Sequence, residues 1–140
     1  MSSNTNLSFI AGIGTDIIRT DRIKGVFERH QERFVKRILG NEEQQVFWRR
    51  YGRDKNRGML YLATRFAAKE AFSKAIGLGM RQPMSWSRMQ TLNAPSGKPQ
   101  VRLSEPLRSW YEGRFGEAHI SLTDESNIVM AFVVVEALNS

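Results

Sequence analysis

Glu70 and Lys74 place a carboxylate and an ammonium group one helical turn apart in a stretch that is otherwise mostly apolar. Residues four apart lie on one face of a helix. Arg65 and Lys69 form a second charged stripe with the same spacing, roughly 100–140° around the axis. A helix that is apolar over most of its circumference is normally buried, and buried charges need a partner charge or a ligand. The spacing allows two explanations, ordinary ion pairs on a half-exposed helix or a site that uses these charges for chemistry.

Asp16 is a second candidate carboxylate, because it lies in an apolar stretch that also contains Gly12 and Gly14. The two glycines predict a β-bulge or a close approach by another backbone or by a ligand. A carboxylate in such a strand is either an exposed strand end or cap, or it is compensated by hydrogen bonds or a cation. If Asp16 and Glu70 meet across a strand and a helix, they suit Mg²⁺, which takes one or two protein carboxylates beside phosphate oxygens and waters.

Two further features have weaker chemical meaning. His119, one of two histidines, shares a strand face with Ser121 and Thr123 and has either a structural or a catalytic role. The turn at residues 97–99 offers backbone N–H groups and a lysine to a phosphate, but such turns also close ordinary hairpins. The sequence contains no Walker-type phosphate loop, zinc-ligand spacing or serine-hydrolase elbow.

The elements that must position these residues follow from hydrophobic periodicity and from turn residues. Asp21 and Asn41 are predicted to cap helices, and residues 52–58 are predicted to form a basic loop. Helices in the first half and strands mostly in the second indicate an α+β architecture. The predicted helices cover residues 21–31, 34–39, 41–51, 59–76 and 105–115, and the predicted strands cover 9–18, 84–92, 100–103, 119–123 and 128–135.

Composition indicates a basic, non-membrane protein. The 140 residues suit one domain, and we predict a flexible leader over residues 1–8 followed by a domain over residues 9–140. No apolar run reaches the length of a membrane span, and the absence of cysteine fits a cytoplasmic location. The net charge of +7 predicts an anionic partner such as nucleic acid, a phosphorylated small molecule or an acidic protein. The basic residues concentrate in the first half of the chain.

Taken in order, these segments closely resemble the holo-acyl-carrier-protein synthases, which are short-type 4′-phosphopantetheinyl transferases. The resemblance extends over residues 10–137, and its helix motif and strand aspartate are specific. It implies helices packed on an antiparallel sheet. The matching segments are GIGTDI at 12–17, RI at 22–23, LATRFAAKEA at 62–71, KA at 74–75, GLG at 77–79, GKP at 97–99 and HISLTDE at 119–125.

The resemblance implies transfer of 4′-phosphopantetheine from coenzyme A to a serine of apo acyl carrier protein, a step of fatty acid biosynthesis that releases adenosine 3′,5′-bisphosphate. Asp16 and Glu70 match the family's Mg²⁺ ligands. Lys74, one turn beyond Glu70, is expected to stabilise or protonate the leaving phosphate. The general base is either a metal-bound water helped by Glu70 or a carboxylate of the carrier protein.

Other matches concern the coenzyme. Arg65 and His119 match positions near the phosphates of the nucleotide, and Gly97, Lys98 and Pro99 match a segment that lines the coenzyme cleft. Lys69 gains least from the resemblance, and its stripe with Arg65 is still expected to serve partly in surface ion pairs.

The resemblance also implies two protein partners. Carrier proteins are acidic, so Arg22, with Arg19, Lys24 and Arg29 nearby, is the expected docking surface. Members of the family form homotrimers with active sites between subunits. Many relatives have an acidic residue at the position of Arg19, which makes this chain's docking contacts differ in detail.

Two other functional classes fit the composition. A basic α+β domain with aromatic residues can bind nucleic acid through phosphate contacts and base stacking, and here these residues are Trp48, Tyr51, Trp86 and Trp110. An interaction module can also bind an acidic protein without catalysis. Both leave Asp16, Glu70 and His119 without a role, and we therefore predict no nucleic-acid partner.

Overall fold

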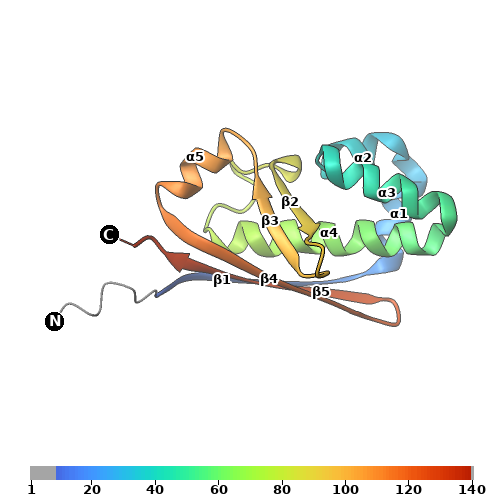
Figure 1. Cartoon of the computed structure of the whole chain (residues 1–140). Coiled ribbons are helices and arrows are strands. Elements are labelled where there is room, and N and C mark those ends of the chain that lie inside the picture. Colours follow the sequence, from blue (N-terminus) through green and yellow to red (C-terminus); the bar gives the residue numbers. More distant parts are fainter. Residues whose placement is uncertain (1–8, 140) are drawn as a thin grey trace.

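The computed structural model describes residues 9–139, so the predicted leader at residues 1–8 lies outside the described residues. Its centre is an antiparallel sheet of three strands in the order β1-β5-β4 (Figure 1). Together with the helices packed on it, this sheet confirms the predicted α+β class. The strands are β1 (Ile10–Arg19), β4 (Phe115–Glu125) and β5 (Ile128–Ala137).

One long helix, α4 (Lys55–Ala75), lies along one face of this sheet (Figure 1). The two backbones touch because β1 carries glycines at the crossing. A Cβ atom built on Gly14 would lie 1.8 Å from the carbonyl oxygen of Ala71, and one on Gly12 would lie 1.9 Å from that of Ala75. The close backbone approach predicted from the two glycines is therefore confirmed, and β1 also has an irregular register between Ile10 and Gly12.

Three shorter helices lie at one end of α4, on the right in Figure 1. Two predicted caps are wrong. The helix predicted from Asp21 starts one residue earlier, with Arg19 at the N-cap position, and Asp21 lies in the first turn. Asn41 is likewise the first helical residue after Gly40. The helices are α1 (Thr20–His30), α2 (Glu32–Ile38) and α3 (Asn41–Arg53).

The basic loop predicted at residues 52–58 is wrong. Helix α3 continues to Arg53 and α4 starts at Lys55, so a single residue separates them. That residue is Asp54, whose carboxylate accepts hydrogen bonds from the N–H groups of Asn56 and Arg57 at 2.9 and 3.4 Å. An aspartate at the N-cap starts a helix at once, and the two glycines of this segment are absorbed into the helices.

A two-stranded hairpin and a short helix complete the fold on the side of α4 that is turned away from the three-stranded sheet (Figure 1). The predicted turn is confirmed, since the Ala94 N–H donates to the Lys98 carbonyl at 2.9 Å and Gly97 adopts a φ of 90°. Among the described residues, no helix is long and apolar enough to cross a membrane. The elements are β2 (Met89–Asn93), β3 (Pro99–Leu103) and α5 (Leu107–Glu112), with a 3₁₀ turn η2 (Trp86–Arg88) where the predicted strand was to begin.

The sheet face turned away from α4 carries large apolar side chains, and we call it the outer face. Alternation along the strands puts one residue in two on this face. Its exposed apolar members are Ile13 at 57%, Ile17 at 61%, Ile128 at 39%, Met130 at 42% and Phe132 at 42% exposure.

Candidate functional site

Asp16 and Glu70 lie next to each other at the crossing of β1 and α4. Asp16 follows Gly14 on the strand face that is turned to α4, and Glu70 precedes Ala71, the residue that Gly14 touches. Partial burial, and then the negative charge of Asp16, raise the pKa of Glu70. The two carboxylates therefore meet across strand and helix, which spacing alone left open.

Lys74 completes this group, which we call the carboxylate site. Its Nζ donates to the carbonyl oxygen of Thr15 at 2.9 Å and lies 3.3 Å from Asp16 Oδ1. The ion pair thus reaches across to β1, instead of running along the helix to Glu70 as an i,i+4 pair would. The charges of Lys74 and of Arg22 on α1 lower the pKa of Glu70, against the larger effects of burial and Asp16.

The other charged stripe of α4 is not on the surface, so that expectation is wrong. Arg65 is 5% exposed and Lys69 is fully buried. Lys69 Nζ lies 2.7 Å from Glu43 Oε1, and Glu43 is also fully buried. Helix α3 and strand β2 cover this side of α4, so the two cations point into the protein. Glu43 lies in the first turn of α3, where an acid is favourable in itself, so its role as the partner of Lys69 had no signal in its own helix.

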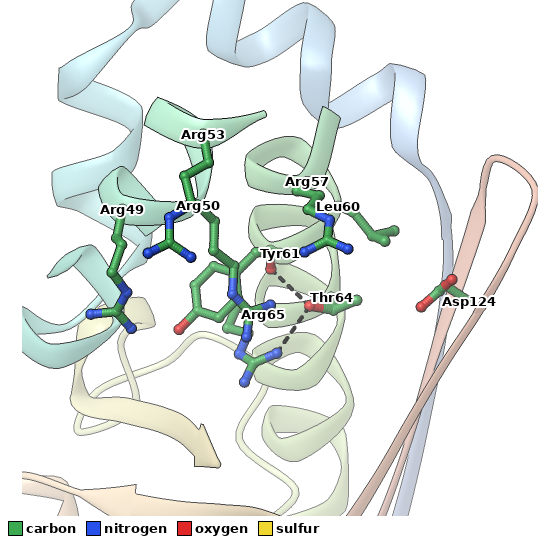
Figure 2. A pocket seen from close by; sticks show the side chains of 9 residues that line it. All are labelled: Arg49, Arg50, Arg53, Arg57, Leu60, Tyr61, Thr64, Arg65 and Asp124. Atoms are coloured by element: carbon green, nitrogen blue, oxygen red, sulfur yellow. Dashed lines mark hydrogen bonds between the residues drawn. The ribbon is translucent and has the colours of Figure 1, made fainter. Parts of the chain in front are cut away.

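Arg65 lines a hollow of about 580 Å³, which we call the arginine pocket (Figure 2). Figure 2 shows guanidinium groups from α3 and α4 gathered around the ring of Tyr61, with Asp124 of β4 standing apart. The guanidinium carbons of Arg65 and Arg50 lie 4.2 and 4.9 Å from the centroid of that ring. The pocket is lined by Arg49, Arg50, Arg53, Arg57, Leu60, Tyr61, Thr64, Arg65 and Asp124.

The side chains in this pocket are strongly affected by burial. Burial lowers the pKa of Arg65 and raises the pKa of Tyr61 to about 12. So many guanidinium groups around one hollow repel one another, and an anion relieves that repulsion. Guanidinium groups favour phosphate and carboxylate, which they bind through paired N–H donors.

Sequence reasoning missed the other arginines of this pocket as site residues. Arg49 and Arg53 are four apart on α3, the spacing of one helix face, whereas Arg57 belongs to α4. That signal was lost because residues 52–58 were read as a loop. Asp54 is extended, and α3 turns back along α4, because Glu43 near the start of α3 meets Lys69 near the end of α4. The arginines of the two helices therefore face one another across the pocket.

The predicted turn at Gly97, Lys98 and Pro99 closes the β2–β3 hairpin close to this pocket. Arg65 Nη2 donates to Asn93 Oδ1 at 3.2 Å, and Asn93 is the last residue of β2 before the turn. A second hollow of about 260 Å³ extends from the arginine pocket to Asn93. The structure thus brings the turn and Arg65 into one neighbourhood.

His119 does not join either group within the chain. It pairs in register with Val134, whereas Asp16 pairs with Ala131 of the same strand, so the two side chains lie on opposite faces of the sheet. On the outer face, His119 Nε2 lies 2.6 Å from Glu136 Oε2. Glu117 is close by, with one ligand atom of each of the three residues within 4.8 Å of the others.

These groups define the chemistry that the chain can support. Two carboxylates beside an ammonium group offer oxygen ligands to a hard divalent cation, and the arginine pocket offers donors to phosphate. A polyphosphate ester that brings a divalent cation uses both kinds of group.

Comparison with known proteins finds similarity to a superfamily of transferases. The family model described as the 4′-phosphopantetheinyl transferase superfamily matches residues 12–133. The chain is 57% identical over 127 residues to the holo-[acyl-carrier-protein] synthase of Bordetella pertussis, covering 91% of this chain and 83% of that protein. For the synthase of Methylibium petroleiphilum the identity is 54%, with 91% and 96% covered.

Solved structures of such synthases share the fold. The Neisseria meningitidis enzyme superposes with a TM-score of 0.83 at 37% identity, covering 91% of this chain and 98% of that one. The Bacillus anthracis enzyme, solved in complex with CoA (3′,5′-ADP), gives 0.75 at 32% identity, covering 94% and 99%. The chain therefore belongs to the 4′-phosphopantetheinyl transferase superfamily.

Proposed function

We propose that this chain is a holo-[acyl-carrier-protein] synthase acting in fatty acid biosynthesis. A serine hydroxyl of the apo carrier protein attacks the phosphorus of coenzyme A that carries the pantetheine arm. A new bond forms between the serine oxygen and this phosphorus as the bond to the bridging oxygen breaks, and the hydroxyl proton passes to a general base. The products are the holo carrier protein and adenosine 3′,5′-bisphosphate. The observation that carries the proposal is the meeting of Asp16, Glu70 and Lys74 at one crossing.

Asp16 and Glu70 fit a magnesium ion. They supply two carboxylates in a partly buried place, where the pKa of Glu70 is raised by that burial and by the charge of Asp16. A divalent cation offsets that repulsion, and oxygen ligands are the ones that Mg²⁺ takes. When bound there, Mg²⁺ supplies positive charge against the phosphoryl oxygens as the bond to the bridging oxygen breaks.

Lys74 is proposed to act on the leaving phosphate. Its ammonium group is anchored to Asp16 and to the Thr15 carbonyl, yet its side chain is 52% exposed. Two of its three donors are held by the protein and the third can point to a ligand. The ammonium group therefore reaches a phosphate oxygen without moving its anchors, and it stabilises or protonates that oxygen.

The phosphorylated nucleotide end of coenzyme A is proposed to bind in the arginine pocket. Arg65 was expected near these phosphates, and it lines the pocket beside Arg57 and three arginines of α3. Gly97, Lys98 and Pro99 would line the same cleft from the hairpin. Replacing coenzyme A by 3′-dephospho-coenzyme A should weaken binding to the wild type and much less to Arg65→Met. An equal loss in both proteins would argue that this phosphate binds elsewhere.

A homotrimer with shared sites is proposed because His119 and the carboxylate site lie on opposite faces of one sheet. A second copy that seats its own carboxylate site beside the outer face would meet there the His119 of the first chain, so that His119 and the Asp16 and Glu70 of the second copy surround one ligand. The exposed apolar side chains of the outer face support this contact, because faces of this kind are usually covered in oligomers.

Subunit mixing tests the shared site. Glu70→Gln and His119→Ala are each expected to reduce transfer strongly, and chains of the two variants co-expressed and purified together should regain activity that neither has alone. Light scattering should give a mass three times the 16.1 kDa of one chain. A trimer without regained activity would place the whole site in one chain, and a monomer would remove the proposal.

The carrier protein is proposed to dock on α1. Arg22, Lys24 and Arg29 are exposed on this helix, and the charge of Arg22 acts on the pKa of Glu70. A docked acidic protein would therefore bring its serine to the carboxylate site. The cytoplasm, where coenzyme A and carrier proteins meet, is the proposed location.

One incubation tests the proposed activity. The purified chain is mixed with coenzyme A, Mg²⁺ and an apo carrier protein, and the carrier is then measured by intact-mass spectrometry. The expected result is a gain of one phosphopantetheine, which is absent when the carrier's serine is replaced by alanine. An unchanged carrier mass after incubation with the correctly folded chain would refute the transferase proposal.

A further inference from the structure

A fully buried ion pair joins α3 to α4. The side chains of Glu43 and Lys69 are both 0% exposed, with 2.7 Å between Oε1 and Nζ, and Lys69 Nζ also donates to the carbonyl oxygen of Met89 on β2. Well-packed apolar residues usually replace such pairs without loss of stability. The need for a stable core therefore does not account for the pair, and its contacts suggest another use.

Glu43 and Lys69 form hydrogen bonds with backbone groups on the edge of β2 that faces α4. Glu43 Oε2 accepts a hydrogen bond from the Thr91 N–H at 2.8 Å, and the carbonyl oxygen of the same Thr91 accepts one from Arg65 Nε at 3.1 Å. Glu43 and Arg65 thus hold the two backbone groups of one residue. Any shift of Glu43 moves the acceptor that orients the Arg65 guanidinium.

Glu43 also fixes the start of α3. Its Oε1 accepts a hydrogen bond from the Gly40 N–H at 3.0 Å, and its own N–H donates to Gln90 Oε1 at 3.1 Å. Helix α3 carries Arg49, Arg50 and Arg53 into the arginine pocket. One carboxylate is therefore bonded to both walls from which the arginines project.

The bonds of Arg65 leave it ready for a ligand. An arginine has five N–H donors, and three are used by Thr91, by Thr64 at 3.3 Å and by Asn93 at 3.2 Å. Within the part of the chain that the structure describes, five minus three leaves two donors for an anion. The guanidinium is held in a fixed orientation before any ligand arrives, which lowers the entropy lost on binding.

We propose that Glu43 and Lys69 are positioning residues, which fix β2 and α3 against α4 so that Arg65 presents its free donors to a phosphate in the arginine pocket. This inference rests on the proposed function, because it takes that phosphate to belong to coenzyme A. The pair then sets affinity for the coenzyme and has no direct part in the chemical step.

The test uses Glu43→Gln/Lys69→Met, which removes both charges at nearly constant volume, in place of a single change that leaves one charge buried and unpaired. Calorimetry with adenosine 3′,5′-bisphosphate should give a Kd raised roughly ten- to hundredfold, which is the effect of losing one charge-assisted hydrogen bond to the ligand. KM for coenzyme A should rise in the same way, with kcat and KM for the carrier protein little changed. Leu107→Ala, a core truncation in α5, serves as the control that lowers stability and leaves Kd unaltered.

Making the double change in the Arg65→Met variant separates an effect on the orientation of Arg65 from a general loss of rigidity. In Arg65→Met the double change should weaken binding hardly at all, because residues that act through one another are not additive. Equal weakening with and without Arg65 would overturn the inference, as would an unchanged Kd in the folded double variant. If that variant does not fold, Glu43→Gln alone is measured, and failure of both to fold assigns the pair a structural role and also overturns it. A wild type that binds neither coenzyme A nor the bisphosphate would instead remove the proposed function, and this inference with it.

Discussion

Gly14→Ala should damage the carboxylate site without touching any charged group. The added Cβ would lie 1.8 Å from the carbonyl oxygen of Ala71, 2.8 Å from the Ala71 carbonyl carbon and 2.9 Å from the backbone nitrogen of Ala75. All three are backbone atoms, so no side chain can rotate away. Strand β1 and helix α4 must move apart.

The size of that movement follows from the contact distance. Ordinary Cβ contacts begin at 3.4 Å, which is 1.6 Å more than the 1.8 Å available. Asp16 lies two residues along the strand and Glu70 lies next to Ala71, so their separation should grow by about an ångström or more. Misplacement of reacting groups by ~1 Å costs about 10²-fold in rate, and overpacking a core costs ~1–3 kcal/mol of the free energy of unfolding.

The assay is carrier modification followed by intact mass, performed well below the unfolding temperature. We expect kcat/KM to fall about a hundredfold and half-maximal activity to need more Mg²⁺, because the two carboxylates no longer meet. Gly52→Ala is the matched control. Gly52 lies in α3 with nothing within 4 Å of its added Cβ, so this change should leave activity intact and stabilise the chain by roughly 0.5–1 kcal/mol.

Wild-type activity and wild-type Mg²⁺ dependence in folded Gly14→Ala would refute this reasoning. So would an activity loss that merely follows the fraction of unfolded protein. Either result would mean that β1 shifts without separating Asp16 from Glu70, and that the close approach at Gly14 serves packing only.

Three other predictions follow from single contacts. Glu70→Gln should reduce Mg²⁺-dependent transfer on the order of 10²-fold or more. Its melting temperature should be unchanged or higher than that of the wild type, since burial and the charge of Asp16 disfavour the ionised Glu70 carboxylate. Full activity at ordinary Mg²⁺ concentrations would count against a ligand role for Glu70. Arg22→Glu should raise KM for the carrier far more than for coenzyme A. Arg114→Glu should change neither KM, because Arg114 follows α5 in the chain and α5 lies at the opposite end of α4 from α1 (Figure 1). Equal effects of Arg22→Glu on both substrates would move the docking surface elsewhere. Burial raises the pKa of Tyr61 from 10.0 to about 12, so its contribution to stability is complete below pH 10.0 and is lost as pH rises to about 12, because the tyrosine of the unfolded chain ionises first. The melting temperature of Tyr61→Phe should therefore fall less steeply than that of the wild type over this pH range. Identical pH profiles of the two proteins would show that the fold does not protect the phenol from ionisation.

The sequence was most informative where one residue type decides the backbone. Gly12 and Gly14 in an apolar strand predicted a close approach, and the structure places α4 there. The hairpin turn was predicted because residues 93–99 are dense in turn formers, and the structure shows that Gly97 supplies a positive φ there. These features depend on neighbours in the chain, which any reader of the sequence can see.

Caps and helix breaks were less predictable, because several residues compete for each of them. Asp21 was expected to cap α1 and is instead the second residue of its first turn, since the chain enters the helix directly from β1 through Arg19. Gly52 and Gly58 suggested a loop, yet Asp54 alone suffices to end one helix and begin the next. The arginine pocket was missed for that reason, because Arg53 and Arg57 fell in the predicted loop and the pocket forms only where α3 packs back on α4.

The two charged stripes of α4 show what periodicity leaves undecided. Both have the same spacing, and spacing alone favoured the same surface ion pairs for each. Beside Glu70 and Lys74 the neighbouring strand carries glycines, so its backbone comes close and the next side chain, Asp16, completes a site at the rim. Beside Arg65 and Lys69 the neighbour is a helix with an acidic residue, Glu43, that enters the core. The partner of a helical charge is set by which element covers that side of the helix, and that element is far away in the sequence.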